Sequence, residues 1–408
     1  MKSLAVSLIL AVSGLLLVAG VVEKWRHRRN LASIPIRVLV NGTRGKTSVT
    51  RLIAAVLREA QVPTWAKTTG TQAAWVLPDG SEREYRKNRP VNIREQIPFI
   101  RAARRDGAQA VVIECMALHP ENQKMMGWEF VRPTVQVMTN ARVDHVCEIG
   151  ATEGETVATL AQSIFPQARV VADDARFDAY TPNRVSSLEE RVEEGYVESF
   201  DYPMFQDNVR QALAVARLLG VDRQTALGGM RKARPDVGMC GPFRVGCCTV
   251  INAFAANDLD SSRALLHKAL DQYGLAGQPL WVLFNNRSDR EFRLGEFLPL
   301  IGELAAQGAR VRVIGENQDK AARFFARKAG AQAQKLDPPP LDWIDSLKDQ
   351  RCAVLCLGNI KGAARETIEA LQTRKAEWCP QPGAAAEPGG GAGQAQAGQE
   401  ERTGHTQG

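Results

Sequence analysis

The apolar residues of this 408-residue chain fall into short runs that alternate with longer amphipathic segments. Between Ile34 and about Val237, short runs typical of buried strands are separated by segments whose apolar residues recur at helical spacing. The predicted strands are Ile36–Val40, Ala110–Ile113, Val135–Met138 and Val170–Ala172. The predicted helices are Ser48–Ala60, Ile97–Arg105, Glu155–Phe165 and Asp207–Leu219. This alternation predicts an α/β fold with a mostly parallel sheet that is covered on both faces.

A segment rich in turn formers, Pro235 to Pro242, interrupts the alternation, and a second α/β series follows it. Its predicted strands are Val245–Ile251, Leu280–Phe284, Arg310–Ile314 and Ala353–Leu357. Its predicted helices are Ser261–Tyr273, Gly295–Gln307, Gln318–Lys328 and Ala364–Thr373. The series predicts a separate, smaller Rossmann-like domain of about 135 residues.

The N-terminal end carries an uncharged, almost wholly apolar run from Ser3 to Val22, about the length of a helix that crosses a bilayer. Basic residues follow it from Lys24 to Arg29, and such a flank stays in the cytoplasm. We therefore predict a single-pass anchor in the cell (inner) membrane, with Met1 outside and all later domains cytoplasmic. The alternative is a signal peptide cleaved near Ala19, but its charge would precede the apolar core, where only Lys2 lies.

These patterns divide the chain into five predicted parts. From about residue 380 onwards the sequence is mostly Gly, Ala, Gln, Glu and Pro, and it has too few large apolar residues to fold. The parts are a transmembrane anchor (1–22), a basic juxtamembrane linker (23–33), a first α/β domain (34–238), a Rossmann-like domain (239–376) and a disordered tail (377–408).

Charge and cysteine content exclude several classes of protein. The formal net charge of +7 includes the juxtamembrane cluster, whose expected partner is anionic lipid headgroups, and no nucleic-acid-binding motif accompanies it. The eight cysteines show neither C-x-x-C pairs nor zinc-type spacing with histidine. We expect them to be reduced and mostly buried.

The segment Asn41–Ser48 reads Asn-Gly-Thr-Arg-Gly-Lys-Thr-Ser and lies between a predicted strand and a predicted helix. Glycines there let backbone N–H groups approach phosphates, and the helix dipole favours the negative charge. Lys46 would reach the phosphates and the Thr47 hydroxyl would bind Mg²⁺. The strict Walker A spacing requires a glycine at position 40, where this chain has Val40. The alternative is a chance glycine turn before a helix.

Further polar residues follow other predicted strands. Glu114 ends the strand-like run 108–113 and is placed to hold Mg²⁺ opposite Thr47, although a solvated strand-end glutamate is the alternative. Asn140-x-x-x-Asp144-His145 follows the next predicted strand, and His145 could ligate a second metal ion. A capped turn is the other interpretation of that motif. Asn257 and Asp258 similarly follow a strand of the second domain, where they could simply cap a helix.

Taken together, these motifs resemble those of the Mur ligase and folylpolyglutamate synthase superfamily. Within it, the chain is most similar to the membrane-attached catalytic subunits of poly-γ-glutamate synthases, which make capsule or slime polymers. The segments that carry this similarity are Ile34–Leu52, Lys67–Thr71, Arg89–Gln96, Val112–Ala117, Ile251–Asp258 and Asn285–Arg290. The similarity extends from the anchor to about Thr373.

The resemblance implies a P-loop ATP site with two Mg²⁺ ions, for which Mn²⁺ could substitute. Lys46, Glu114 and His145 would be catalytic, with Thr47 and Glu114 on the first metal and His145 on the second. Asn208 falls where the superfamily contacts adenine, and Asn257 and Asp258 fall where the second domain closes on the nucleotide. The implied nucleotide-binding residues are Gly42, Thr43, Arg44, Gly45, Lys46, Thr47, Ser48, Asn208, Asn257 and Asp258.

The resemblance also implies a reaction, in which ATP phosphorylates a γ-carboxylate and the amine of a glutamate then displaces phosphate. Candidate contacts for glutamate and the growing polyanionic polymer are Arg89, Arg94, Arg287 and Arg290. Small multi-span membrane proteins of a synthase–exporter complex are expected partners. Assembly of the chain into a homo-oligomer is a further possibility.

Two features depart from the superfamily. No lysine lies between Lys124 and Lys232 to be carbamylated on the second metal, and Pro235–Gly238 replaces the usual Pro-Gly-Arg at the domain junction. An ATPase that energises polymer export, and a γ-glutamyl ligase with another acceptor, are the alternative functions.

Overall fold

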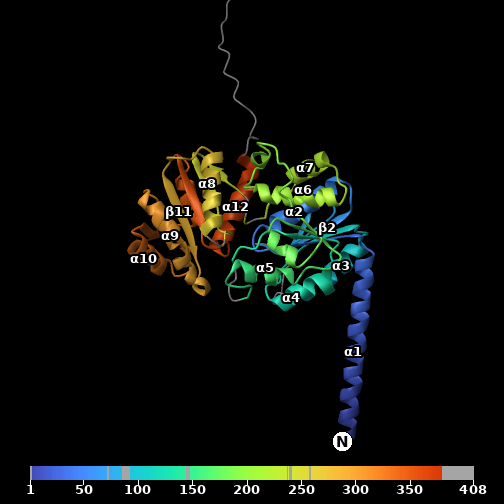
Figure 1. Ribbon diagram of the computed structural model, residues 1–408. Coiled ribbons are helices and arrows are strands. Elements are labelled where there is room, and N and C mark those ends of the chain that lie inside the picture. The colour runs from blue at the N-terminus through green and yellow to red at the C-terminus, as the bar shows by residue number, and fades with distance from the viewer. Residues whose placement is uncertain are drawn as a thin grey trace, which may run out of the picture.

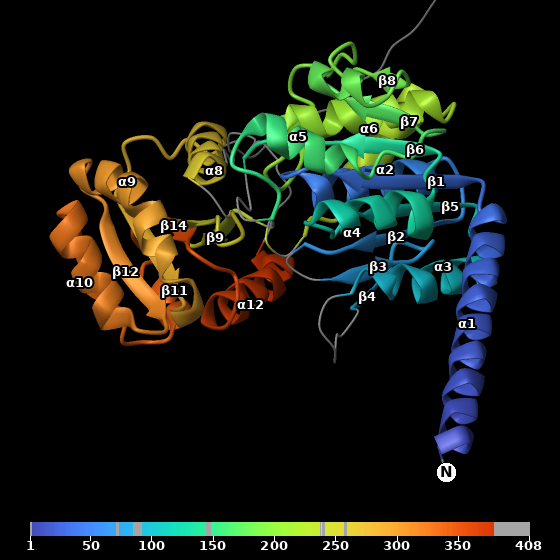
Figure 2. The same cartoon turned by 60° about the horizontal axis from the view of Figure 1, so that its bottom comes forward.

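The computed structural model describes residues 2–70, 73–84, 92–143, 148–236, 238, 241–256 and 259–378, and Figures 1 and 2 show it from two directions. Its first element, α1 (Lys2–Ala32), projects from the rest of the molecule, which it meets only at its C-terminal end (Figure 1). Within α1, residues 5–32 are long and apolar enough to cross a membrane, a property that no other helix in the described ranges has. Its apolar side chains are exposed, Leu17 by 71%. The helix is therefore a candidate membrane anchor.

The C-terminal end of α1 packs against the first α/β unit. Leu31 is buried in the core, and His27 Nε2 lies 2.9 Å from the carbonyl oxygen of Phe130. Lys24 Nζ pairs with Glu129 at 3.0 Å on the surface. Residues 23–32, which belong to the predicted basic linker (23–33), continue the helix, and these contacts fix them to the domain.

The first sheet has the strand order β4-β3-β2-β5-β1-β6-β7-β8 (Figure 2). Along this order, all neighbouring strands from β2 through β5, β1, β6 and β7 to β8 pair in parallel. The β2–β3 and β3–β4 pairs are antiparallel. The strands are β1 (Ile36–Asn41), β2 (Thr64–Thr68), β3 (Ala74–Val76), β4 (Glu82–Glu84), β5 (Ala110–Glu114), β6 (Val135–Met138), β7 (Arg169–Ala172) and β8 (Arg184–Val185). Val40 of β1 pairs with Glu114, and Asn41 pairs with Met138, so the C-terminal ends of β1, β5 and β6 meet at one edge.

Helices cover both faces of this sheet because alternate residues of each strand point to opposite faces. They are α2 (Lys46–Glu59), α3 (Gln96–Arg105), α4 (Pro120–Met125), the π-helix η2 (Met126–Val131), α5 (Glu153–Ala161), α6 (Gln206–Leu218) and α7 (Arg223–Arg231). On β1, Val38 and Val40 pack against α2, α6 and α7, whereas Leu39 packs with residues of α3 and η2.

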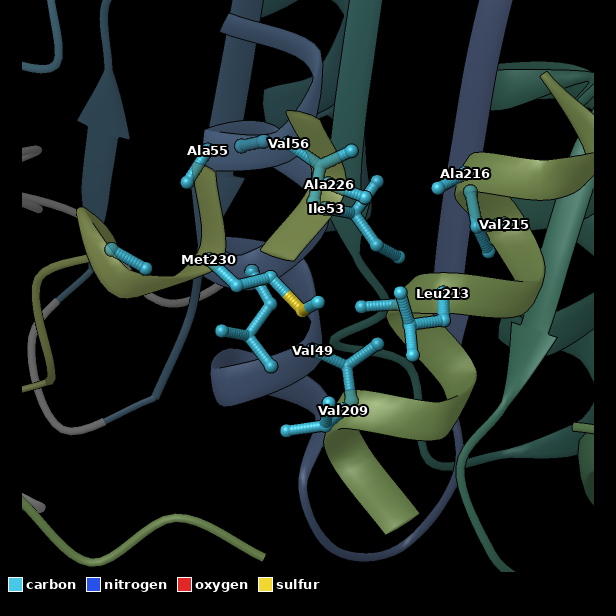
Figure 3. Close-up of a cluster of buried hydrophobic side chains, with 14 of the residues drawn as sticks. Val49, Ile53, Ala55, Val56, Val209, Leu213, Val215, Ala216, Ala226 and Met230 are labelled. Carbon is cyan, nitrogen blue, oxygen red and sulfur yellow. The ribbon is translucent and has the colours of Figure 1, made fainter. Parts of the chain in front are cut away.

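The apolar face of α2 packs against α6 and α7 in a continuous buried cluster (Figure 3). Val49 and Ile53 of α2 lie among Val209 and Leu213 of α6 and Met230 of α7, and all of these side chains are at most 3% exposed. Burial of each such side chain stabilises the fold by about 1.5–3 kcal/mol. This packing fixes the position at which α2 begins, directly after the glycine loop.

The second sheet has the order β13-β12-β11-β14-β10-β9 and is parallel except for β9. Its strands are β9 (Phe243–Val245), β10 (Cys248–Asn252), β11 (Leu280–Asn286), β12 (Arg310–Gly315), β13 (Gln332–Lys335) and β14 (Cys352–Leu357). The helices α8 (Leu259–Gln272), α9 (Phe292–Ala306) and α10 (Gln318–Ala329) cover one face. The other face is covered by α11 (Pro340–Ser346) and α12 (Ala363–Trp378).

This architecture confirms the predicted α/β class, the two mostly parallel sheets and every predicted strand of the first series. One strand prediction is wrong: Val245–Ile251 is not continuous, because a turn at Gly246, with φ +60°, separates β9 from β10. The hydrophobic pattern did not predict the strands β2, β3, β4, β8 and β13 or the helices α4, η2, α7 and α11. The predicted α5 ends at Ala161 rather than Phe165. Among the described cysteines, Cys115, Cys248, Cys352 and Cys356 are buried, Cys247 is exposed, and all are free.

Candidate active site

The loop between β1 and α2 has a backbone that requires both of its glycines. Gly42 has φ +129° and Gly45 has φ +80°, conformations that L-residues rarely adopt. The space beside each is also taken: a Cβ atom on Gly42 would lie 2.1 Å from Thr139 Oγ1, and one on Gly45 would lie 2.8 Å from Asn208 Oδ1. The loop can therefore pack closely against the segments that follow β6 and open α6.

Residues after β6 clamp this loop from one side. Asn140 Oδ1 accepts hydrogen bonds from Thr43 Oγ1 at 2.7 Å and from the Arg44 N–H at 3.2 Å. Its Nδ2 donates to the Arg44 carbonyl at 3.1 Å, and Thr139 Oγ1 donates to the same carbonyl at 2.5 Å. Together these bonds satisfy polar groups of Thr43 and Arg44 and attach the loop to the segment that follows β6.

The start of the loop is held by a buried polar network. Asn41 Nδ2 donates to Gln123 Oε1 at 2.7 Å and to Ser163 Oγ at 2.9 Å. Its Oδ1 accepts the Gly42 N–H at 2.8 Å. All of these side chains are buried, so a loss of one partner would leave unpaired polar atoms in the interior.

The N-terminus of α2 presents positive charge to the loop. Gly45 precedes the helix and provides no side-chain cap, which leaves the first-turn N–H groups, Ser48 among them, available to an anion. The Lys46 ammonium group donates to the carbonyl oxygens of Gly42 at 2.7 Å and Thr43 at 3.1 Å. Loop, helix end and lysine thus form a cationic cradle at the edge of the sheet.

Thr47 and Glu114 meet beside this cradle. Thr47 Oγ1 donates to Glu114 Oε1 at 3.0 Å, and the backbone N–H of Thr69 donates to Glu114 Oε2 at 2.6 Å. Burial raises the pKa of Glu114, while Lys46, the Thr69 N–H and the Thr47 hydroxyl act in the opposite direction. A buried carboxylate next to a hydroxyl is suited to hold a small divalent cation.

The space in front of this pair fits such a cation. A Cβ atom on Gly70 would lie 2.5 Å from Thr47 Oγ1, so the absence of a side chain leaves room over the hydroxyl. Hydroxyl and carboxylate oxygens suit Mg²⁺ and Mn²⁺. Over the described ranges, no group of three or more His, Cys, Asp or Glu side chains is arranged as a metal site. Nucleotide oxygens would have to complete the coordination. Asp144 and His145 lie outside the described residues.

A pocket of about 260 Å³ adjoins the clamp. Thr139 and Asn140 line it together with Asp207 and Gln211 at the start of α6. Gln211 Nε2 donates to the Thr139 carbonyl at 2.8 Å, whereas its buried Oε1 has no hydrogen-bond partner in the described structure. Asn208, predicted to contact adenine, is buried against Gly45 in the same region.

Arginines of the second unit lie close enough to the loop to interact electrostatically. Burial lowers the pKa of Arg293, and the charges of Arg290, Arg44 and Arg287 lower it further. Arg287 pairs with Asp289 at 2.6 Å. Arg287 and Arg290, both predicted substrate contacts, and Arg44 of the loop therefore all lie near enough to Arg293 to act on its charge.

The remaining predicted site residues are placed elsewhere or lie outside the described structure. Arg94 pairs with Glu23 of α1 at 2.5 Å and is 58% exposed. Arg89, Asn257 and Asp258 lie outside the described residues.

Several residues of this site were not assigned a role from the sequence. Thr139 and Asn140 contact the loop from almost one hundred positions away, and Gly70 and Asp236 approach Thr47 from two other segments. Asn140 was visible as the first residue of the Asn-x-x-x-Asp-His motif. Nothing local in the sequence identifies Asp236 or Arg293.

Comparison with known proteins identifies the class. Residues 40–178 match the family model of the Mur ligase middle domain. The fold is similar to a solved structure of bifunctional folylpolyglutamate synthase/dihydrofolate synthase from Yersinia pestis, complexed with AMPPNP and a Mn ion. The TM-score is 0.62 at 13% identity, covering 86% of this chain and 93% of that one. Fold and loop together define an enzyme of the Mur ligase class.

More specific similarity comes from two capsule proteins and a second family model. Residues 242–374 match the poly-gamma-glutamate synthase CapB C-terminal domain. PGA synthase CapB of Bacillus subtilis is 31% identical over 393 residues, 90% of this chain and 98% of that protein. Capsule biosynthesis protein CapB of Bacillus anthracis is 34% identical over 297 residues, 69% of this chain and 64% of that protein. The chain belongs to the CapB family of poly-γ-glutamate synthases, which confirms the resemblance and the predicted class of ATP-dependent ligase.

Proposed function

We propose that this protein extends poly-γ-glutamate at the cytoplasmic face of the membrane, in an ATP-dependent reaction that passes through an acyl phosphate. One observation carries the proposal: Lys46 and Thr47 open α2, whose N-terminus has no side-chain cap, and Thr47 is hydrogen-bonded to the buried Glu114. Phosphate groups are the chemistry that such a cradle recognises. The family membership supplies the substrate class, glutamate and its γ-linked polymer.

In this proposal the loop binds the ATP phosphates through the first-turn N–H groups of α2 and through Lys46. Lys46 exchanges its bonds to the Gly42 and Thr43 carbonyls for phosphate oxygens, while Asn140 keeps the loop in place. The pocket beside Thr139 takes the nucleoside, and the unpaired Gln211 Oε1 offers an acceptor to its amino group. A Mg²⁺ or Mn²⁺ ion held by Thr47 and Glu114 would offset the charge on the transferred phosphoryl group.

A free carboxylate in water does not form an amide with an amine, so the reaction first activates the carboxylate. The γ-carboxylate oxygen of the polymer attacks the γ-phosphorus of ATP, and ADP leaves. The amine of the incoming glutamate then attacks the acyl carbon, loses a proton, and inorganic phosphate leaves. Lys46 and the N-terminus of α2 stabilise negative charge at the phosphate throughout.

Further assignments belong to the same proposal. Arg44, Arg287 and Arg290, whose charges all act on the buried Arg293, would receive substrate carboxylates. Closure of the second unit would exclude water from the acyl phosphate. A second metal ion on His145, nucleotide contacts by Asn257 and Asp258, and an adenine contact by Asn208 stay predictions, as does a substrate role for Arg89 and Arg94.

The membrane assignment rests on α1. Its exposed apolar side chains and the basic residues at its C-terminal end support a single-pass anchor with the N-terminus outside. The basic residues would lie at anionic headgroups. An anchor of this kind forms no channel, so small multi-span membrane proteins are the expected export partners.

An isotope experiment on the full-length protein in lipid nanodiscs tests the reaction. With glutamate labelled by ¹⁸O in its carboxylates, an acyl-phosphate route delivers ¹⁸O to inorganic phosphate and releases ADP. Lys46→Ala should abolish transfer, whereas Lys320→Ala, which removes an exposed lysine that pairs with Glu291, should not. Release of AMP and pyrophosphate, or ATP turnover that does not need glutamate, would contradict the proposal.

A further inference from the structure

A buried carboxylate that the proposed reaction does not use lies beside the Thr47–Glu114 pair. Asp236 follows α7, on the segment that leads to the second sheet, and it is only 5% exposed. Its Oδ1 accepts a hydrogen bond from the Gly238 N–H at 2.8 Å. Its Oδ2 is buried and has no hydrogen-bond partner in the described part of the chain. An unpaired buried carboxylate oxygen costs free energy unless a ligand satisfies it.

The unpaired oxygen faces the space that Gly70 leaves open. A Cβ atom on Gly70 would lie 3.0 Å from Asp236 Oδ2 and 2.5 Å from Thr47 Oγ1, so both oxygens border the same small region. Glu114 borders it too, because its Oε1 lies 3.0 Å from Thr47 Oγ1. Oxygen atoms from α2, from the end of β5 and from the connecting segment therefore lie around the Thr47 hydroxyl.

The charges around this hydroxyl leave negative charge in excess. Arg51 is the nearby arginine, but its guanidinium group already forms two hydrogen bonds with the Glu82 carboxylate, at 2.5 Å and 3.0 Å. Arg51 also acts on Glu114 and Asp236, and Lys46 acts on Glu114, so two cations face the three carboxylates Glu82, Glu114 and Asp236. Two like charges held close together in the interior repel each other, and a small divalent cation between them would remove that repulsion.

We propose that Asp236 is a third protein ligand, direct or through one water, of the divalent cation that Thr47 and Glu114 hold. The inference rests on the proposed function and adds a residue to its metal site. Because Asp236 belongs to the segment leading to the second sheet, the cation would also join that segment to the glycine loop.

Electron paramagnetic resonance of Mn²⁺ tests the ligand without any measurement of activity. Mn²⁺ is titrated into the full-length protein in nanodiscs with saturating AMPPNP, for the wild type, Asp236→Asn, Glu114→Gln and Asp337→Asn. Asp236→Asn keeps the shape of the side chain and an oxygen for the Gly238 N–H, and should raise the Mn²⁺ Kd by about 10–100-fold. Asp337, 76% exposed and paired with Lys335, is the matched control and should leave the Kd unchanged.

A second variant keeps every carboxylate in place. Gly70→Ala inserts a methyl group beside the Thr47 hydroxyl and should weaken Mn²⁺ binding in the same way, with the melting temperature checked for both variants. A wild-type Kd in Asp236→Asn would overturn the inference and leave the proposed ligase site intact. A wild-type protein that binds AMPPNP but no Mn²⁺ would overturn the proposed metal site as well.

Discussion

The Thr47 hydroxyl donates a hydrogen bond to Glu114 Oε1 across 3.0 Å, joining the first turn of α2 to the end of β5. Two residues 67 positions apart thereby become one unit at the edge of the sheet. The hydroxyl is directed toward the buried carboxylate. In the proposed site, these two side chains would hold the metal ion beside the glycine loop.

Removal of the Thr47 hydroxyl should therefore reduce turnover much more than stability. Thr47→Val keeps the shape of the side chain but removes its oxygen, and we expect kcat to fall by about 10²-fold or more, as for other groups that stabilise transition-state charge. Thr47→Ser retains the oxygen and should keep most of the activity. ADP release in the presence of glutamate measures both. A Thr47→Val enzyme with wild-type kcat would exclude the hydroxyl from the reaction.

Glu114 should make the metal-free protein sensitive to pH. Burial raises the pKa of Glu114 above its ordinary 4.5, so the folded state holds this proton more tightly than the unfolded chain. Protonated Glu114 therefore makes its full contribution to the free energy of unfolding below pH 4.5. This contribution is lost as the pH rises through the raised pKa of the folded state. In EDTA, the melting temperature of the wild type should fall relative to that of Glu114→Gln across this window. Parallel curves for the two proteins would show that Glu114 is not buried as described.

Two glycines in left-handed backbone offer a matched test of the loop. Gly42→Ala would place a methyl group 2.1 Å from Thr139 Oγ1, whereas Gly107→Ala meets no atom within 4 Å. Gly107→Ala should cost only about 1–2 kcal/mol of stability from its backbone conformation. Gly42→Ala should cost more and should also abolish ATP binding, measured by calorimetry. Equal effects of the two substitutions would mean that the loop does not depend on close packing against Thr139.

The sequence predicted those features that are local along the chain. The glycine loop, Lys46, Thr47 and Glu114 each follow a strand that an apolar run predicts, and the parallel order of β5, β1 and β6 brings them together. Hydrophobic periodicity also predicted four helices in each series, because their apolar faces are buried against the sheets, but it missed α4, η2, α7 and α11.

Features that depend on distant segments were not predicted. Asn140 contacts Thr43 from 97 positions away, and Asp236 reaches the space beside Gly70 only after α7 returns the chain to the sheet edge. An isolated asparagine or aspartate has no periodicity that would reveal such contacts. The missed turn at Gly246 has another cause, since apolar residues on both sides of it continued the strand pattern.

Asn140 offers the sharpest test of the clamp. Asn140→Ala removes three side-chain hydrogen bonds to Thr43 and Arg44, at 2.7–3.2 Å, while the fold around it stays intact. If these bonds are worth at least about 1.4 kcal/mol to the loop conformation, the Kd for ATP should rise by about tenfold or more. Asn140→Asp keeps the acceptor atoms but adds negative charge beside the phosphates, so it should bind ATP more weakly still. Asn183→Ala, at an exposed asparagine that donates to the Pro166 carbonyl, is the control and should bind ATP like the wild type. Wild-type affinity in Asn140→Ala, measured by calorimetry, would show that the loop holds its shape without the clamp.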